Sequence, residues 1–244
     1  MNMVRKIALL IALALFFALP AQAKPGVVEF LDPNCTPTPE PGVQIPTATI
    51  SPEAAALPWN LTLVNRTNPV PPDWTVELKE LSNGQKVDAR IYADLQAMFD
   101  ACRADGLKPM VMTSYRTYED QQDMLVLKYR RYKNGGLSHV EAQKKALTVA
   151  SYPGYSEHQL GLAVDVDSSD TETCSNESVW NWMKRHCQDY GFIWRYPGVK
   201  TEITGISNED WHFRYVGREA AKYIMENQLC LEEYLAQFYS IPLD

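Results

Sequence analysis

Two short stretches of the chain carry the side chains best suited to bind a metal. The stretch SEHQLGLAVD places His158 seven residues before Asp165, and the stretch EDWHFRY supplies Glu209 and His212. A catalytic zinc ion takes three protein ligands, nitrogen or oxygen, and leaves a fourth position to water. We therefore expect His158, Asp165 and His212 to bind one Zn²⁺ ion, with Glu209 left over as the base that takes a proton from water.

The other candidate ligands have simpler interpretations. A single histidine is more often a hydrogen-bonded core or surface residue than a ligand, and we interpret His139 and His186 in that way. Asp167 has the same strand parity as Asp165 but lies closer to the following loop, so it is the second choice as a ligand.

The first stretch changes from a turn to a strand. Residues 160–166 alternate larger apolar side chains with Gly161, Ala163 and Asp165, which indicates a strand with two unlike faces. The two small residues are expected to leave room on the face of Asp165 for a metal and a ligand.

The second stretch must meet two structural demands. His212 lies in a predicted strand, residues 211–215, and it can share an ion with Asp165 only if the two strands are neighbours, which antiparallel pairing would allow. Glu209 precedes His212 by three residues, so in an extended strand their side chains would point to opposite faces. The start of this segment must therefore bend.

Arg116 is the candidate for substrate recognition. It lies between a predicted strand, residues 108–114, and a predicted helix that is capped by Thr117 and runs to about Asn134. A guanidinium fork binds a carboxylate through two hydrogen bonds, which suits a peptidase that acts at a free C-terminus. A structural ion pair with a nearby acidic residue fits the spacing equally well.

Apolar periodicity predicts the remaining elements. They are helices at 87–105, from Ser138 toward Ser151, and at 179–190, 217–227 and 231–239, a strand at 192–196, and a short apolar strand around Leu61 and Leu63.

The N-terminus resembles an export signal. Arg5 and Lys6 precede the apolar run Ile7–Leu19, and a small-x-small site ends at Ala23, so we expect residues 1–23 to be removed. Thirteen apolar residues are fewer than the roughly 20 that a membrane-spanning helix needs. An uncleaved signal that tethers the protein to a membrane is the alternative.

A proline-rich segment follows the signal. Eight prolines within residues 24–58 predict an extended spacer without helix or central strand. Residues 59–244 are predicted to form one catalytic domain. A net charge of -7 and the absence of a basic stripe exclude a typical nucleic-acid binder.

The odd number of cysteines leaves their pairing open. Disulfides are possible in an exported protein, and Cys174 with Cys187 or Cys102 with Cys230 could pair, with Cys35 remaining. Buried free thiols are about equally compatible with the sequence.

Three separated blocks of the sequence resemble a known family. SYRTYEDQQ, SEHQLGLAVD and EDWHFRY are similar, in this order, to the blocks of VanY-type D-alanyl-D-alanine carboxypeptidases. These belong to a wider group with lysostaphin-like peptidases, other D-Ala-D-Ala metallopeptidases and the hedgehog signalling domain. The similarity extends over about residues 61–235.

The resemblance implies a fold, a reaction and a role for individual residues. The fold would be α+β, with a small antiparallel sheet flanked by helices and zinc on one sheet face. The reaction would be removal of the terminal D-alanine from peptidoglycan stem peptides. The implied site consists of zinc ligands His158, Asp165 and His212, catalytic Glu209, Arg116 near the metal, and peptide contacts Gln121 and Ser156.

Other functions remain open at this point. The motifs do not separate a D,D-carboxypeptidase from an L,D-carboxypeptidase that acts on tetrapeptide stems, or from a wall-peptide endopeptidase. A non-catalytic zinc module that binds the wall is less compatible, because such a module needs neither a base nor a carboxylate clamp. We expect an exported monomer that acts outside the cytoplasm.

Overall fold

The computed structural model describes residues 50–243. The expected signal peptide, most of the spacer and Cys35 lie outside the described residues. Among residues 50–243, no helix is both long and apolar enough to cross a membrane.

The described end of the spacer differs from the expectation. It contains one helical turn, α1 (Pro52–Ala55), whose cap Ser51 accepts a hydrogen bond from the backbone N–H of Ala54. Proline fits there because the first helical position needs no hydrogen-bonded N–H. Ala54 and Leu57 pack against a buried cluster, so the prediction that this segment forms no helix is wrong at its C-terminal end.

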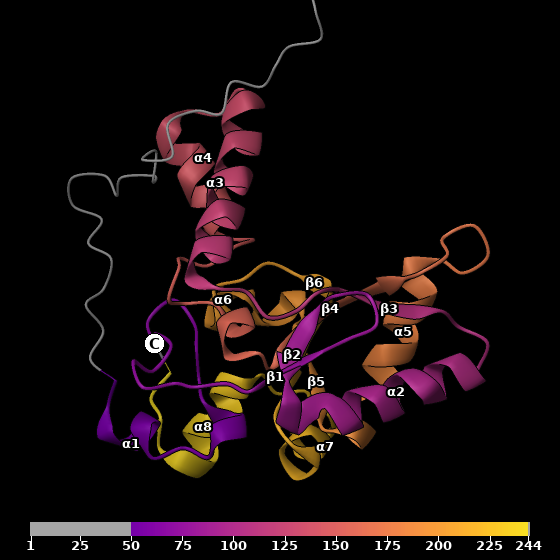
Figure 1. Cartoon of the computed structure of the whole chain (residues 1–244). Coiled ribbons are helices and arrows are strands. Elements are labelled where there is room, and N and C mark those ends of the chain that lie inside the picture. The colour runs from indigo at the N-terminus through magenta and orange to yellow at the C-terminus, as the bar shows by residue number, and fades with distance from the viewer. Residues whose placement is uncertain (1–49, 244) are drawn as a thin grey trace, which may run out of the picture. The chain divides into compact units, whose positions relative to one another are not determined.

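The fold is built on a four-stranded antiparallel sheet (Figure 1). The strand order is β3–β4–β6–β5, and all neighbouring pairs are antiparallel. The strands are β3 (Pro109–Thr113), β4 (Ala163–Ser168), β5 (Phe192–Tyr196) and β6 (Glu209–Tyr215). The small antiparallel sheet implied by the resemblance is therefore confirmed.

The two faces of β4 and β6 carry different kinds of side chain. Val164, Val166 and Phe213 are fully buried in the main core. That core also contains residues of α2 (Tyr92–Ala104) and α5 (Asn176–His186). Because side chains alternate along a strand, Asp165 and His212 lie on the opposite face, where they are direct partners across the β4–β6 pair.

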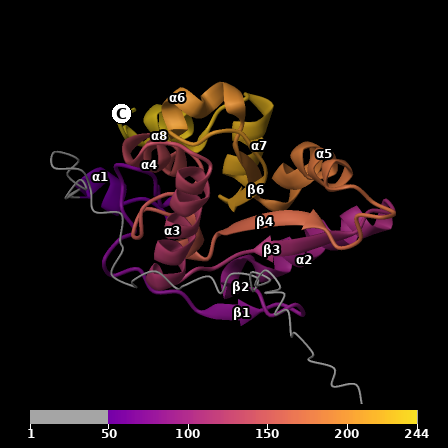
Figure 2. The ribbon, with the colours of Figure 1, turned by 90° about the horizontal axis from the view of Figure 1, so that it is seen from above.

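A helical hairpin rises on the side of this second face (Figures 1 and 2). It consists of α3 (Tyr118–Asn134) and α4 (His139–Leu147). Both begin with a capping box, at Thr117 and at Ser138. Leu125 of α3 packs with Ala146 to hold the hairpin together. Both predicted helix starts are thus confirmed.

The C-terminal helices enclose a second core. α7 (Arg218–Glu226) and α8 (Leu231–Tyr239) pack around Ile193 of β5. The short helix α6 (Thr201–Thr204) lies in the connection between β5 and β6. The 3₁₀ turns are Trp59–Leu61, Ala89–Ile91, Glu157–Leu160, Cys187–Tyr190 and Gly198–Lys200.

Two predicted elements differ from the structure. Residues 87 and 88, expected at the start of the first helix, belong to β2 (Lys86–Asp88), which pairs with β1 (Leu78–Glu80) in a hairpin. The turn contains the pair Asn83–Gly84, a common hairpin signal that the sequence interpretation overlooked. The strand expected around Leu61 and Leu63 is a 3₁₀ turn followed by irregular chain.

Gly161 has a different role from the one expected. It ends the 3₁₀ turn with φ +75° and precedes β4, so it does not share the strand face of Asp165. A Cβ atom there would lie 3.1 Å from the backbone nitrogen of Asp88, which donates a hydrogen bond to the Gly161 carbonyl. Ala163 lies opposite Arg214 in the β4–β6 pair. The small residues therefore accommodate a close backbone approach and a buried arginine, and they do not form the floor of a cleft.

The four cysteines among residues 50–243 are free and buried. Neither suggested disulfide, Cys174–Cys187 or Cys102–Cys230, is present in the structure. Burial raises the pKa of the thiols of Cys102, Cys187 and Cys230 to about 12, so they remain protonated and inert near neutral pH.

Candidate metal centre

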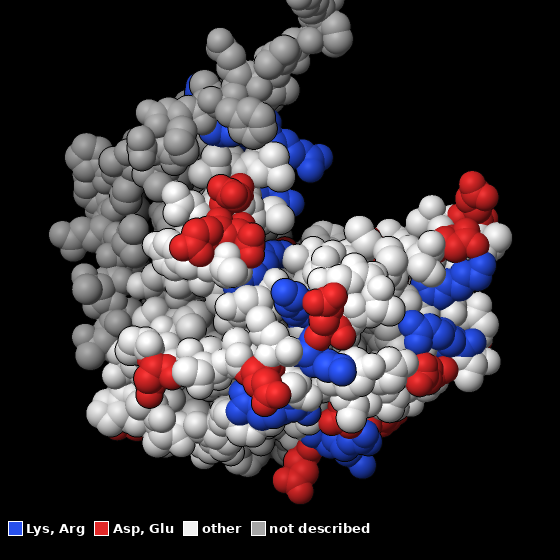
Figure 3. All heavy atoms as spheres, viewed as in Figure 1, with Lys and Arg blue, Asp and Glu red and all other residues white. Residues whose placement is uncertain are grey.

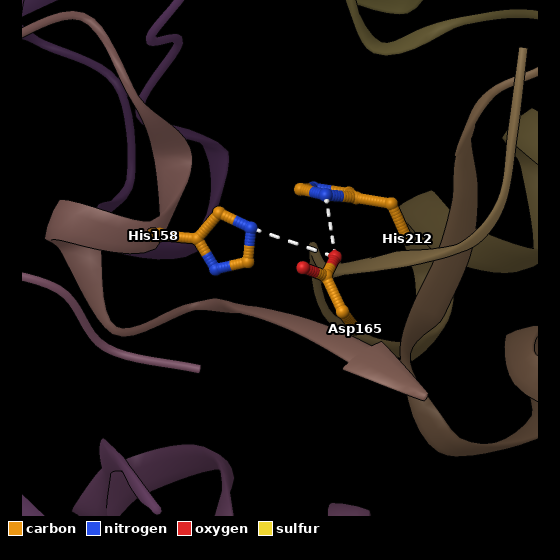
Figure 4. A group of neighbouring side chains, drawn as sticks. All are labelled: His158, Asp165 and His212. Carbon is orange, nitrogen blue, oxygen red and sulfur yellow. Dashed lines mark ion pairs between the residues drawn. The ribbon is translucent and has the colours of Figure 1, made fainter. Parts of the chain in front are cut away.

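His158, Asp165 and His212 come together at one point (Figure 4). One ligand atom from each lies within 4.8 Å of the other two. Oδ1 of Asp165 is 3.5 Å from Nε2 of His158 and 3.1 Å from Nδ1 of His212. The three side chains that were singled out from two distant stretches of sequence therefore form one cluster.

A hydrogen bond orients the His158 ring. Its Nδ1 lies 2.8 Å from the carbonyl oxygen of Ser114, just after β3. A carbonyl only accepts, so Nδ1 carries the proton and donates. The lone pair of Nε2 is then directed toward Asp165 and is available for a metal.

His212 is oriented in the opposite sense. Its Nδ1 faces Asp165, while its Nε2 lies 3.5 Å from Oε2 of Glu157. These last two atoms are buried and have no closer hydrogen-bond partner. Glu157 can thus keep the proton of His212 on Nε2 and leave Nδ1 as the donor to a metal, the usual arrangement of carboxylate, histidine and metal.

The carboxylate of Glu157 is held by two arginines. Its Oε1 accepts hydrogen bonds from Nε of Arg195 (2.8 Å) and Nη1 of Arg214 (3.0 Å). Arg195 also forms a bidentate pair with Glu232. All four residues are buried. This network was not found from the sequence, although arginines within the apolar strands FIWRY and HFRY were a signal that could have revealed it.

Burial and neighbouring charges shift the pKa values of the ligands. Burial alone would raise the pKa of Asp165, but His158 and His212 outweigh it and hold that pKa well below its usual range. Burial lowers the pKa of His158 to about 4. Burial opposes protonation of His212 too, but Asp165 and Glu157 raise its pKa to about 9.

Glu209 reaches the cluster because β6 bulges. Trp194 pairs with Phe213 and Tyr196 pairs with Glu209, so two steps along β5 correspond to four along β6. The bend expected before His212 is therefore present. Oε2 of Glu209 lies 3.5 Å from Nδ1 of His212, and burial raises the pKa of this carboxyl to about 7.

Arg116 reaches the same centre from the junction of β3 and α3. Its Nη2 donates to Oδ2 of Asp165 (3.3 Å) and its Nη1 donates to Oε1 of Gln121 (3.0 Å). Gln121 is fully buried, and its amide nitrogen donates to the carbonyl of Ser151. Nε of Arg116 is buried without a partner. Arg116 thus takes part in a structural ion pair and still has one free donor.

A cleft of about 330 Å³ opens above these groups. Gln121 and Ser156 line it, so their expected role as peptide contacts stays a prediction; in the structure the Gln121 amide holds Arg116. Tyr196 also lines the cleft, its ring 4.8 Å from that of His212, and was not predicted from the sequence.

The alternative ligands lie elsewhere. Asp167 accepts a hydrogen bond from the indole of Trp180 and is not part of the metal cluster. His139 contacts Tyr129 in the helical hairpin, and the ring of His186 packs against Trp182. These positions agree with the ordinary roles expected for both histidines.

Comparison with known proteins identifies the family of this chain. The family model for VanY, D-alanyl-D-alanine carboxypeptidase, matches residues 84–218, which include every residue of the cluster and Arg116. The chain belongs to the VanY family. A D-alanyl-D-alanine carboxypeptidase of Enterococcus faecalis is 51% identical over 177 residues, or 72% of this chain. The match covers 66% of that protein, slightly less than two thirds of its length.

Two solved structures of VanY proteins are similar to this chain. VanYB in complex with D-alanine-D-alanine is 50% identical, with a TM-score of 0.73 over 74% of this chain and 99% of that one. A variant of the vancomycin-resistance D,D-pentapeptidase VanY in complex with Zn(II) is 51% identical, with a TM-score of 0.71 over 73% of this chain and 99% of that one. The fold of this VanY protein is therefore that of zinc D,D-peptidases.

Proposed function

We propose that this protein is an exported zinc-dependent D-alanyl-D-alanine carboxypeptidase. It would remove the terminal D-alanine from peptidoglycan stem peptides. The observation that carries the proposal is the meeting of His158, Asp165 and His212 at one point, with Glu209 beside them. The names of the similar VanY proteins supply the substrate and the metal.

The donor set suits one zinc ion. Two imidazole nitrogens and a carboxylate oxygen are a ligand combination of catalytic zinc sites. Oδ1 of Asp165 is buried and has no hydrogen-bond partner among the described residues, as expected for an atom directed at a cation. We propose that Nε2 of His158, the carboxylate of Asp165 and Nδ1 of His212 hold the ion. When bound, zinc lowers the pKa of water and polarises a carbonyl oxygen.

Glu209 is proposed as the general base and then the general acid. Its carboxylate can take a proton from the attacking water and return it to the amine of the departing D-alanine. A pKa raised to about 7 by burial suits both steps near neutral pH, although a bound cation would lower it again.

Arg116 is proposed to bind the substrate beside the metal. The buried Nε group has no partner, so it can donate to the scissile carbonyl or to the terminal carboxylate. Gln121 fixes the guanidinium from the opposite side. This arrangement favours an enzyme over a zinc module that only binds the wall, because a binding module does not require a buried base.

Export is proposed from residues 1–23 and from the substrate, which lies outside the cytoplasm. Residues 24–49 would separate the domain from a membrane or wall surface. We also propose a monomer, because one chain supplies His158, Asp165 and His212.

Peptides that differ at the C-terminus test the reaction. We expect the zinc-loaded protein to release one D-alanine from a pentapeptide stem ending in D-Ala-D-Ala, and much less from the tetrapeptide that remains. Release from the tetrapeptide alone would make the protein an L,D-carboxypeptidase. Cleavage of a cross-linked peptide with a blocked C-terminus would indicate an endopeptidase. No hydrolysis of any of these peptides would support a non-catalytic module.

A further inference from the structure

One face of α3 continues from the metal centre into the outer part of the cleft. Gln121, Met124, Lys128 and Arg131 recur at a spacing of three or four residues, and all four line the cleft. Such spacing places them in one row along a helix. The adjacent face, with Leu125, packs on α4 and fixes the orientation of the helix. The row is therefore a fixed wall of the cleft.

Two cations at the outer end of this row form no ion pair within the described part of the chain, although Lys128 is near enough to Glu209 for its charge to favour the ionised form of that carboxyl. Among residues 50–243, neither Lys128 nor Arg131 is in an ion pair or a side-chain hydrogen bond. The acidic residues that line the cleft are Asp165 and Glu209, and both lie at the metal. Figure 3 shows Lys and Arg atoms along the edge of the α3–α4 hairpin that faces the hollow beside it. The outer cleft is thus positively charged, although the whole chain has a net charge of -7.

The helix itself gives the distance from the metal centre to these cations. Lys128 and Arg131 lie seven and ten residues beyond Gln121, or roughly 10 and 15 Å along the axis. Helical side chains lean toward the N-terminus, here toward the metal centre, which shortens both distances. An extended peptide rises about 3.3 Å per residue. A peptide whose C-terminus lies at Arg116 would therefore bring the groups two to four residues upstream to these cations.

We infer that Lys128 and Arg131 form a subsite for a carboxylate that the substrate carries two to four residues before the scissile bond. The inference rests on the proposed carboxypeptidase function and adds a substrate class to it: acidic stem peptides, in preference to stems whose upstream carboxylate is amidated. Arg116 serves the terminal end, whereas the α3 cations serve the body of the peptide.

Two matched peptides test this subsite. One is N-acetyl-L-Ala-γ-D-Glu-L-Lys-D-Ala-D-Ala. The other is the same peptide with the free α-carboxylate of its D-Glu residue converted to a carboxamide. We expect the wild-type protein to have about tenfold higher kcat/KM for the acidic peptide, mainly through KM, since tenfold corresponds to one charge-assisted contact. The preference should decrease with rising salt, because the subsite is open to solvent.

Variants of α3 connect the preference to these residues. In the double variant Lys128→Gln, Arg131→Gln, the ratio of kcat/KM between the two peptides should fall toward one. The matched control is Arg130→Gln, which removes a charge from a neighbouring position of α3 that does not line the cleft, and it should keep the wild-type ratio. The single variant Lys128→Glu should reverse the preference.

The outcomes separate this inference from the proposed function. Equal hydrolysis of both peptides by the wild-type protein, or an equal loss on both peptides in the double variant, would overturn the subsite and leave the carboxypeptidase function intact. Absence of D-alanine release from both peptides by the zinc-loaded wild-type protein would instead overturn the proposed function.

Discussion

At the residue scale, each of the two proposed histidine ligands is oriented by a different neighbour. The Ser114 carbonyl accepts a hydrogen bond from Nδ1 of His158, and Glu157 faces Nε2 of His212, so each ring can direct the lone pair of its other nitrogen toward Asp165. Zinc affinity depends on such neighbours as well as on the ligands themselves. We therefore expect substitutions of these neighbouring residues, as well as of the ligands, to change zinc affinity.

The variant Glu209→Gln tests the base. It keeps the shape of the side chain but cannot accept a proton, so we expect kcat for D-alanine release to fall by about 10²- to 10⁴-fold. Zinc content per chain should be unchanged. The matched control is Asp210→Asn, because the adjacent carboxylate pairs with Lys184 and does not line the cleft. A Glu209→Gln protein with more than a tenth of wild-type activity would contradict the assigned role.

The variant Glu157→Gln tests the orientation of His212. An amide cannot replace the carboxylate as a strong acceptor, so we expect zinc affinity, measured by competition with a chelator, to fall by about 10- to 100-fold. The control is Glu232→Gln, which weakens the same network at Arg195 but does not face His212. Both variants should unfold at lower temperature, but only Glu157→Gln should lose zinc readily. Equal affinity losses would show that the network is merely structural.

At the element scale, two irregularities in the backbone orient side chains of the candidate site. The bulge in β6 turns Glu209 toward His212, and the junction of β3 with α3 turns Arg116 toward Asp165. Regular strands and helices would have directed these side chains elsewhere. The capping box at the start of α3 fixes the turn that contains Gln121, whose side chain holds Arg116.

The variant Thr117→Ala tests this connection. Loss of the cap should lower the free energy of unfolding by about 1 kcal/mol. It should also raise KM, because the first turn of α3 supports Arg116 through Gln121. The matched control, Ser138→Ala, removes the equivalent cap of α4 away from the cleft, and should destabilise the protein similarly without changing KM. The same KM for both variants would show that the cap at Thr117 does not influence substrate binding.

The local motifs made much of the site predictable from sequence. His158, Asp165, Glu209 and His212 lie in two short stretches, and parity arguments correctly required antiparallel neighbours and a bend before His212. Helix starts were predictable where a capping box was present, because that signal is local.

Features that depend on distant contacts were not predictable from the sequence. Glu157 meets Arg195 and Arg214 across 38 and 57 residues, and periodicity does not show which buried charges will pair. The role of Gly161 depends on its approach to Asp88. The start of the first long helix was misplaced because its apolar periodicity continues into a strand.

At the scale of the whole molecule, the domain begins before the predicted boundary at residue 59. Ala54 and Leu57 pack against the C-terminal core, so α1 belongs to the folded domain. The proline-rich segment before it is outside the VanY match, which begins at residue 84.

Two truncations test this boundary. Removal of residues 1–49 should leave the melting temperature of the zinc-loaded protein and its hydrolysis of soluble peptides close to those of the mature chain. Removal of residues 1–58 also deletes Leu57 and should destabilise the domain by about 1 to 2 kcal/mol, because a partly buried leucine is lost from the core. Equal melting temperatures for the two truncated proteins would place the boundary at residue 59.

The central claim is that one zinc ion, held by His158, Asp165 and His212, makes this protein a carboxypeptidase. The most direct measurement is a titration of zinc into chelator-treated protein while D-alanine release from the pentapeptide is recorded. We predict no release at the start, a rise in proportion to added zinc, and a plateau at one zinc ion per chain. Full activity before any zinc is added, or a plateau of bound zinc without D-alanine release, would contradict the account.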